Sequence, residues 1–517
     1  MRSSESMPPP DGDAAAVAPP FAPAGAGAAE PGRGAVARNV AHLVLGQAGT
    51  TVLAVLLSAA LGRSLGAAEF GLYFVFTSMT AFAFVVVEWG QGQYLVREVA
   101  RRPESAGALL GSALAIRLGG SLAAAAFTAA AAGLLGYDRR GCALATAMVV
   151  TLAPAFLAQT YGATFRGRER MEYDALVSVL NKLLTLAFAV AALLLREGLA
   201  GVIVAQGAAG LGALGLAVLL ARRLGVRARR VTAAASRELV LGGTPIVAMS
   251  LAIAAQAYID AIVLSRLAPP QVLGWYGAAK NILGTLVAPA AILGAAAFPA
   301  LSRAAHDPAR LRRELHAAMR PLLLLAGMAG VGTYLFADLA VSVVYGGSKF
   351  GPAGMVLKAF APGLFLLFVD VLLGSVIVAA GRATALAAAK VLNVVVSTGL
   401  ELVLIPFFQA RAGNGGIGVV VAFAASELMM FAAALLIVPR GALSRGLLAD
   451  LGRALLLGGG TLLVAFVAPG GTFANAAAAA VTFAALAVAL RLVSRAELAA
   501  LVDVVRRRAE ARGRSQG

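Results

Sequence analysis

The 517-residue chain has little charge, a single cysteine and few histidines. Only 13% of its residues are charged whereas 60% are hydrophobic, and no soluble fold could bury so much apolar material. Cys142 is the only cysteine, which excludes an intramolecular disulfide and a cysteine zinc cluster. Two of the three histidines, His306 and His316, share a basic loop and leave no set of metal ligands. We expect a membrane protein without a metal or cofactor.

Lysine is also scarce, and its neighbours exclude one energy source. None of the lysines follows a glycine, so the Gly-Lys pair of a phosphate-binding loop does not occur. We therefore expect no ATP hydrolysis. Any work that the chain does must draw on an ion gradient or on the gradient of its substrate. The lysines stand at Lys182, Lys280, Lys349, Lys358 and Lys390.

Long hydrophobic segments occupy most of the chain. At about 20 residues for each membrane crossing, they predict an all-α polytopic membrane protein with about fourteen transmembrane helices. The predicted helices cover 40–61, 71–90, 107–136, 141–164, 173–195, 199–221, 240–265, 274–299, 319–345, 353–380, 384–408, 416–438, 452–468 and 472–492.

The basic residues support this count. The net charge of +18 would suggest nucleic acid for a soluble chain, but the arginines here gather in short loops between apolar segments. Most of them fall in every second loop, as in Arg97–Arg102, Arg166–Arg170, Arg222–Arg237 and Arg303–Arg320. This asymmetry is a topology signal that places those loops and both termini in the cytoplasm. We expect no nucleic-acid partner.

One stretch occurs twice and divides the chain into halves. The segment 61–73, LGRSLGAAEFGLY, returns at 264–276 as LSRLAPPQVLGWY, with an arginine, a glycine and a tyrosine at matching positions. Each copy separates two hydrophobic segments and therefore predicts a short outer turn. An even number of segments lies between the copies. The two halves should thus be parallel lobes with a substrate path between them.

This repeat defines the predicted domain organisation. We expect two six-helix lobes that superpose on each other, joined by an arginine-rich cytoplasmic linker, followed by an appended helix pair and enclosed by polar tails. The predicted parts are a disordered cytoplasmic tail over 1–37, the first lobe over 38–221, the linker over 222–239, the second lobe over 240–438, two more helices over 439–493 and a basic cytoplasmic tail over 494–517.

The motifs resemble those of a known transporter group. Trp89–Arg101, WGQGQYLVREVAR, follows the first copy of the repeat, and a Gly-Arg pair follows the fourth helix at Gly167 and the tenth at Gly381. A Val-Leu-Asn triplet follows each pair and ends at Asn181 and Asn393. The chain resembles the polysaccharide and oligosaccharide lipid flippases of the multidrug/oligosaccharidyl-lipid/polysaccharide (MOP) exporter superfamily.

The resemblance implies a function and a location. Such a protein moves a lipid-linked saccharide from the inner to the outer leaflet of the bacterial cytoplasmic membrane, coupled to H⁺ or Na⁺ or driven by the substrate gradient. Membrane lipids and polysaccharide assembly proteins are the implied partners. Two alternatives stay open: an ion-coupled multidrug or cation exporter of the same superfamily, and a membrane-integral polysaccharide polymerase or glycosyltransferase.

Ionisable residues inside the predicted helices are the candidate site. Arg117 and Lys182 each lie about ten residues from the cytoplasmic start of their helices, or roughly 15 Å into the membrane. A charge there costs about 2.5–3.5 kcal/mol on insertion scales, so it needs a partner, water or a function. We predict that both bind substrate phosphates. The alternative is a buried pair with a carboxylate such as Glu88 or with helix carbonyls.

The second lobe carries more polar residues. Lys390, Asn393, Ser397 and Glu401 share one helix face, and they line the cavity or form a polar seam between helices.

Two carboxylates in this lobe are the candidates for ion coupling. Asp260 either pairs with Lys280 or binds a coupling ion. Glu427 is a partner for the polar stripe or a protonatable coupling group.

Two weaker predictions concern the first helix and the repeated turns. Gln47, Thr51 and Ser58 share a face of the first helix, where they bind sugar hydroxyls or pack against another helix. Arg63 and Arg266 begin the repeated turns, and we expect each to bond the backbone of its own turn. The alternative is that they are lid or gate residues.

Overall fold

The structure, a computed structural model, describes residues 33–467 and 471–492. Within these ranges it contains helices and no strand, which confirms the predicted fold class. The tail predicted over 494–517 and most of the tail over 1–37 lie outside the described residues. The helices are α1 (Arg33–Glu88), α2 (Gln91–Arg101), the short 3₁₀ helix η1 (Pro103–Ser105), α3 (Ala106–Leu134), α4 (Arg139–Gly167), α5 (Met171–Leu194), α6 (Gly198–Arg223), α7 (Ala233–Leu267), α8 (Pro270–Ala304), α9 (Pro308–Tyr345), α10 (Gly347–Ala379), α11 (Ala383–Ala412), α12 (Gly415–Ile437), α13 (Arg445–Val467) and α14 (Thr472–Ala489).

The described residues contain 13 helices that are long and apolar enough to cross a membrane. The first of them, Leu45–Glu88, has 44 residues. A straight helix of that length would extend about 66 Å, roughly twice the thickness of a bilayer core. It folds back at Gly66, where φ is 77° and ψ is 176°, a conformation that only glycine adopts readily. Because α1 therefore crosses twice, the predicted count of fourteen crossings agrees with the structure.

The second crossing, predicted over 71–90, ends at Glu88 and is followed by a short helix that the sequence did not predict. Trp89 and Gly90 have left-handed backbone conformations, with φ of 48° and 71°, and they turn the chain into the separate 11-residue helix α2. The motif that carries the resemblance thus forms a turn and a short amphipathic helix.

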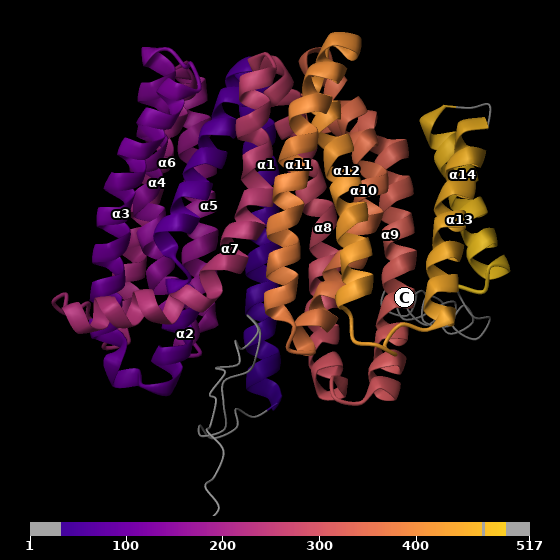
Figure 1. Cartoon of the computed structure of the whole chain (residues 1–517). Coiled ribbons are helices and arrows are strands. Elements are labelled where there is room, and N and C mark those ends of the chain that lie inside the picture. Colours follow the sequence, from indigo (N-terminus) through magenta and orange to yellow (C-terminus); the bar gives the residue numbers. More distant parts are fainter. Residues whose placement is uncertain (1–32, 468–470, 493–517) are drawn as a thin grey trace, which may run out of the picture.

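The helices form two groups with an appended pair (Figure 1). Helices α1–α6 form the indigo and purple group, and α8–α12 form most of the red and orange group. Helix α1 packs against α7 and α8 from the second half, while α13 and α14 pack against α9. We call the end that holds the arginine-rich loops the basic end and the opposite end, with the repeated turns, the motif end. That the two groups superpose stays a prediction.

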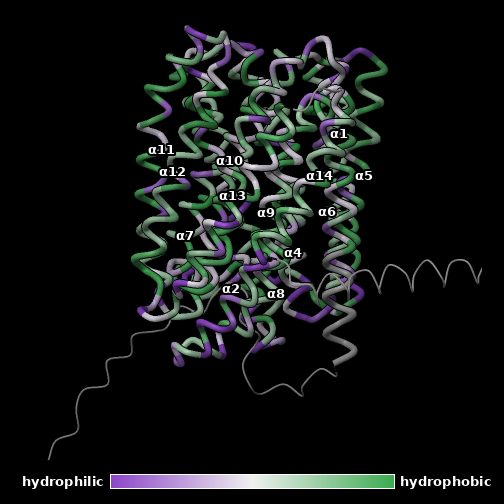
Figure 2. The backbone as a smooth tube through the Cα atoms, turned by 90° about the vertical axis from the view of Figure 1, so that its right-hand side faces the viewer, coloured by the Kyte–Doolittle hydropathy of each residue, from purple (hydrophilic) through white to green (hydrophobic). Residues whose placement is uncertain are grey.

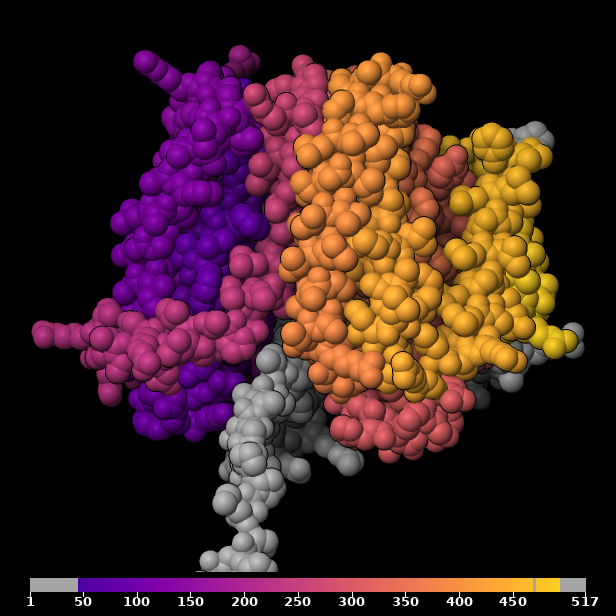
Figure 3. Space-filling view, viewed as in Figure 1, coloured from indigo at the N-terminus to yellow at the C-terminus, as the bar shows by residue number. Residues whose placement is uncertain are grey.

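Helix α7 links the two groups across the basic end. Its first part packs against α2 and α3, and its later part packs against α1, α11 and α12. Figures 1 and 3 show the first part in magenta, lying across the indigo group before the helix rises. Arg102 bonds both Glu98 of α2 and Glu238 of α7, and these bonds hold the pKa of its guanidinium above the usual value. The predicted linker over 222–239 is thus already helical from Ala233.

The outer surface of the bundle is apolar. Phe127 is 66% exposed and Leu436 is 86% exposed, and a soluble protein rarely exposes large patches of such side chains. Figure 2 shows hydrophobic residues along the middle of the helices and hydrophilic ones gathered at both ends. The lateral surface therefore suits lipid, as expected for a membrane protein.

Candidate functional site

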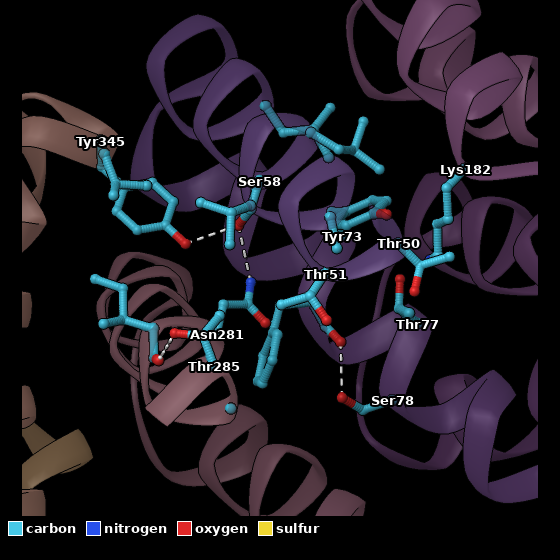
Figure 4. Close-up of a pocket in the computed structure, with 18 of the residues that line it drawn as sticks. Thr50, Thr51, Ser58, Tyr73, Thr77, Ser78, Lys182, Asn281, Thr285 and Tyr345 are labelled. Carbon is cyan, nitrogen blue, oxygen red and sulfur yellow. Dashed lines mark hydrogen bonds between the residues drawn. The ribbon is translucent and has the colours of Figure 1, made fainter. Parts of the chain in front are cut away.

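A cavity with both polar and apolar walls lies where the two groups of helices meet. It consists of a small cavity of about 510 Å³ and a large one of about 830 Å³, both within the range of ~300–1,000 Å³ usual for ligand pockets. Both parts of α1, Lys182 of α5 and Tyr258 of α7 line the two cavities jointly. The small cavity continues to α8 and α9 (Figure 4), and the large one continues to α4 and α6. We call the two together the central cavity.

Most polar groups on the cavity wall are neutral hydroxyls and amides. The predicted face of the first helix, Gln47, Thr51 and Ser58, lines the small cavity. Groups of this kind donate and accept hydrogen bonds and suit a ligand rich in hydroxyls. The neutral polar lining residues are Gln47, Thr50, Thr51, Ser58, Tyr73, Thr77, Ser78, Thr80, Gln159, Ser178, Asn181, Thr185, Gln206, Tyr258, Asn281, Thr285 and Tyr345.

Lys182 is the unpaired charge of this cavity. It lies near the middle of α5 and lines both cavities. Its ammonium group has no hydrogen bond or ion pair with any other residue that the structure describes. A lysine without a partner in the central cavity presents its charge to a ligand that enters the cavity.

Arg117 lies behind the wall of the cavity instead of lining it. Its guanidinium is 3% exposed and bonds the Glu88 carboxylate at 3.3 Å and the Phe156 carbonyl at 3.2 Å. It also stacks over the Phe156 ring, 4.5 Å from the ring centre. Neutralising Arg117 would therefore remove a buried ion pair. The substrate role of Arg117 stays a prediction, and the contacts favour the alternative of a buried pair.

The other charges on the cavity wall are paired as well. Glu88 accepts hydrogen bonds from the backbone amides of Gly90 and Gly92, in addition to its bond with Arg117. Arg166 and Asp174 form an ion pair at 2.6 Å. These groups lie toward the basic end, so the large cavity extends in that direction. The wall therefore carries two carboxylates that are already neutralised.

The two copies of the repeat close the motif end by direct backbone contact. A Cβ atom on Gly71 would lie 2.2 Å from the carbonyl oxygen of Pro270, and one on Gly274 would lie 2.0 Å from that of Ala67. Gly71 matches Gly274 in the repeat, and Ala67 matches Pro270. The contact is therefore reciprocal, as a twofold axis between the halves would make it. Only glycine allows the two helices to approach this closely.

The two arginines of the repeat add reciprocal hydrogen bonds across the halves. Arg63 donates to the carbonyl of Val344 at 3.0 Å and also to that of Val343, near the end of α9. Arg266 donates to the carbonyl of Leu135, just after α3, at 3.4 Å. We expected each arginine to bond its own turn, and this was wrong. Each bonds the opposite half and helps to hold the motif end closed.

A small hydrogen-bond network joins the halves just below this contact. The Ser58 hydroxyl bonds the Tyr345 hydroxyl at 2.7 Å and accepts from the Asn281 amide at 2.9 Å. Figure 4 shows the three side chains converging at one side of the small cavity. The motif end of the cavity is therefore held by side chains as well as by backbone.

In the second half, the predicted charges are paired between helices. Lys280 of α8 bonds Asp260 of α7 and the Ala257 carbonyl, and the Tyr276 hydroxyl also donates to Asp260. The alternative that Asp260 and Lys280 pair with each other is what the structure shows. Lys390 of α11 bonds Asp370 of α10 at 3.0 Å.

The polar stripe on α11 lies between helices. Asn393 is fully buried, Glu401 is 3% exposed, and the Ser397 hydroxyl donates to Glu401 at 3.2 Å. Neither these residues nor Lys390 line the small or the large cavity. The contacts favour the alternative of a polar seam, and their role in binding substrate stays a prediction.

Glu427 of α12 keeps one oxygen without a partner. Its Oε1 accepts from the Gln256 amide of α7 at 2.7 Å. Its Oε2 is buried and has no hydrogen-bond partner among the described residues. Of the two predicted coupling carboxylates, Glu427 is thus the one with a carboxylate oxygen free to bind a proton or a cation. The described residues contain no group of three or more histidine, cysteine or acidic side chains placed to hold a metal ion.

Several wall residues were missed at the level of sequence. Tyr345, Asn281 and Tyr258 belong to no motif. Glu88 was recognised as a buried acid, and its position directly before the Trp-Gly pair was the available signal for its role in the turn.

The fold is shared with solved structures of membrane transporters. At a TM-score of 0.67, the chain is similar to a structure described as lipid II flippase MurJ in an inward closed conformation, with 12% identity over 87% of this chain and 98% of that one. A multidrug resistance MATE family transporter of the MOP superfamily, in an inward-facing conformation, matches at 0.58, with 15% identity over 81% and 98%. A MOP superfamily transporter from Pyrococcus furiosus matches at 0.55, with 16% identity over 82% and 96%. The chain has the fold of these transporters.

The match to a protein family covers the first half of the chain. A family model described as polysaccharide biosynthesis protein matches residues 36–305, more than half of the sequence. The chain belongs to this family. No curated protein sequence matches it.

Proposed function

We propose that this protein moves a lipid-linked saccharide across the bacterial cytoplasmic membrane by alternating access. The observation that carries the proposal is the central cavity, in which one unpaired cation stands among neutral hydroxyls and amides. An ammonium group suits a phosphate, and hydroxyls and amides suit sugar hydroxyls. A lipid-linked saccharide combines both chemistries in one headgroup.

The orientation of the protein in the membrane follows from the charges of the loops. Arginine-rich loops stay in the cytoplasm, so the basic end faces inward and both termini are cytoplasmic. The large cavity then extends toward the cytoplasm while the repeated turns close the outer end. This is the state in which a transporter accepts a headgroup from the inner leaflet.

The alternative of a cation exporter finds less support in the cavity. A cationic substrate needs a carboxylate that is free to pair with it. Glu88 and Asp174 are the carboxylates that line the central cavity within the described residues, and each already has an arginine partner.

Lys182 provides the direct test. Lys182→Gln should reduce flipping of a polyprenyl diphosphate saccharide by roughly tenfold or more, because a charge-assisted hydrogen bond contributes about 1.5–3 kcal/mol. Lys182→Arg should be the milder change. The measurement is the fraction of headgroup that becomes accessible to an impermeant reagent in proteoliposomes. Lys349→Gln, which removes an exposed lysine at the motif end, is the matched control. Full activity of Lys182→Gln would disprove the phosphate role.

Ion coupling is the second part of the proposal. We assign ion coupling to Glu427 in preference to Asp260. The Oε2 atom of Glu427 has no hydrogen-bond partner among the described residues, whereas the Asp260 carboxylate is bound by Lys280 and Tyr276. Glu427→Gln should abolish the dependence of the flipping rate on a pH or Na⁺ gradient, and Asp260→Asn should disturb helix packing as well. If both variants keep the gradient dependence of the parent, neither residue couples ions.

A further inference from the structure

We propose that the saccharide which this protein accepts is uncharged and that the negative charge of the substrate is confined to its phosphate linkage. This inference rests on the proposed function and specifies its substrate class. It excludes acidic sugars such as uronic acids from the headgroup.

The charges on the cavity wall carry the argument. Four charged side chains line the central cavity within the described part of the chain: Glu88, Arg166, Asp174 and Lys182. Arg166 forms an ion pair with Asp174, and Glu88 forms one with Arg117 behind the wall. Lys182 is left as one free cation. One cation can serve the phosphate linkage and leaves nothing to neutralise a carboxylate on a sugar.

The neutral groups available to the sugar are well distributed. Gln47, Gln159, Ser178 and Tyr258 come from α1, α4, α5 and α7, and all of them line the large cavity. Their side chains have no hydrogen-bond partner within the described ranges, and the first three are exposed to the cavity. Four helices thus offer free hydrogen-bonding groups around Lys182, as a ligand with many hydroxyls requires.

An acidic sugar would meet an unfavourable environment here. A carboxylate that leaves water without a cationic partner loses its hydration without compensation. The carboxylates of Glu88 and Asp174 on the same wall would also repel it. The cavity therefore rejects an acidic sugar in two ways: it has no cation to pair with the sugar carboxylate, and its own carboxylates repel that group. Binding sites commonly reject a close analogue by such unfavourable contacts.

Two probes on the same carrier test the inference. A polyprenyl diphosphate with three glucose residues and one with three glucuronic acid residues are reconstituted separately with the wild-type protein. Flipping is measured by impermeant periodate, which cleaves the vicinal diols of either sugar. The glucose probe should cross at least about tenfold faster. Equal rates, or a faster acidic probe, would overturn the inference and leave the flippase proposal standing. If neither probe crosses, both proposals fail.

A charge-adding variant shows whether charge is the cause. Ala81→Lys places a second cation on the large cavity at a half-buried position whose side chain offers the sugar no hydrogen bond. It should raise the rate of the glucuronic acid probe severalfold and leave the glucose probe within about twofold of wild type. If the variant flips the glucose probe normally and the acidic probe no faster than wild type does, charge does not set the selectivity and the inference is overturned.

Discussion

Valine in place of Gly71 should open the outer end of this protein. Any side chain at this position places a Cβ atom 2.2 Å from the carbonyl oxygen of Pro270. That oxygen belongs to the backbone and cannot rotate away, so the two repeated turns must move apart. Overpacking costs about 1–3 kcal/mol and often more, and the closed state bears this cost while an outward-open state does not. We expect the population to shift toward the open state by tenfold or more.

The single cysteine makes the measurement simple. Cys142→Ser gives a background without cysteine, and Thr50→Cys then places one thiol on both cavities. In spheroplasts, an impermeant maleimide should label this thiol slowly in the parent and several times faster in Gly71→Val. Gly332→Val is the control, because a Cβ at Gly332 meets nothing within 4 Å.

The reciprocal partner gives a second check. Gly274→Val should have the same effect as Gly71→Val, since a Cβ there meets the carbonyl oxygen of Ala67 at 2.0 Å. If both variants fold, keep the parent's labelling rate and transport normally, the repeated turns do not form the outer gate. The motif would then have a purely structural role in the turn.

Much of this fold could be predicted because membrane helices follow from simple periodic signals. Apolar length predicts the crossings, and the arginine loops confirm their number. The short helix α2 was missed, because a local backbone conformation decides the path of the chain there. Nothing in the composition of Glu88–Gln91 shows that Trp89 and Gly90 adopt left-handed conformations and begin a new helix.

The site was less predictable, because depth in the membrane does not reveal which way a side chain faces. Arg117 and Lys182 lie at similar depth, and the sequence assigned both the same role. The structure separates them, with Arg117 against Glu88 and Phe156 behind the wall and Lys182 on the cavity. Long-range pairs such as Lys390 with Asp370 are equally invisible to periodicity, since they depend on how α10 and α11 pack.

Glu88→Gln should be the most destabilising single change in the cavity wall. It leaves the Arg117 guanidinium, which is 3% exposed, without its carboxylate. Removing one partner of a buried pair costs about 3–5 kcal/mol. Arg117→Gln should cost less, about 1–3 kcal/mol, because the Glu88 carboxylate is 25% exposed and keeps its bonds to two backbone amides.

The double variant Glu88→Gln with Arg117→Gln separates the two roles of Arg117. If the pair is structural, neutralising both residues removes the unpaired charge, so the double variant should be more stable than Glu88→Gln alone. The fraction of monodisperse protein after heating in detergent measures this order. With a purely structural pair, the double variant should also flip the glucose probe at a rate near that of wild type. If it folds as well as wild type but does not flip, Arg117 binds the phosphate after all. The cavity would then present two cations to the substrate.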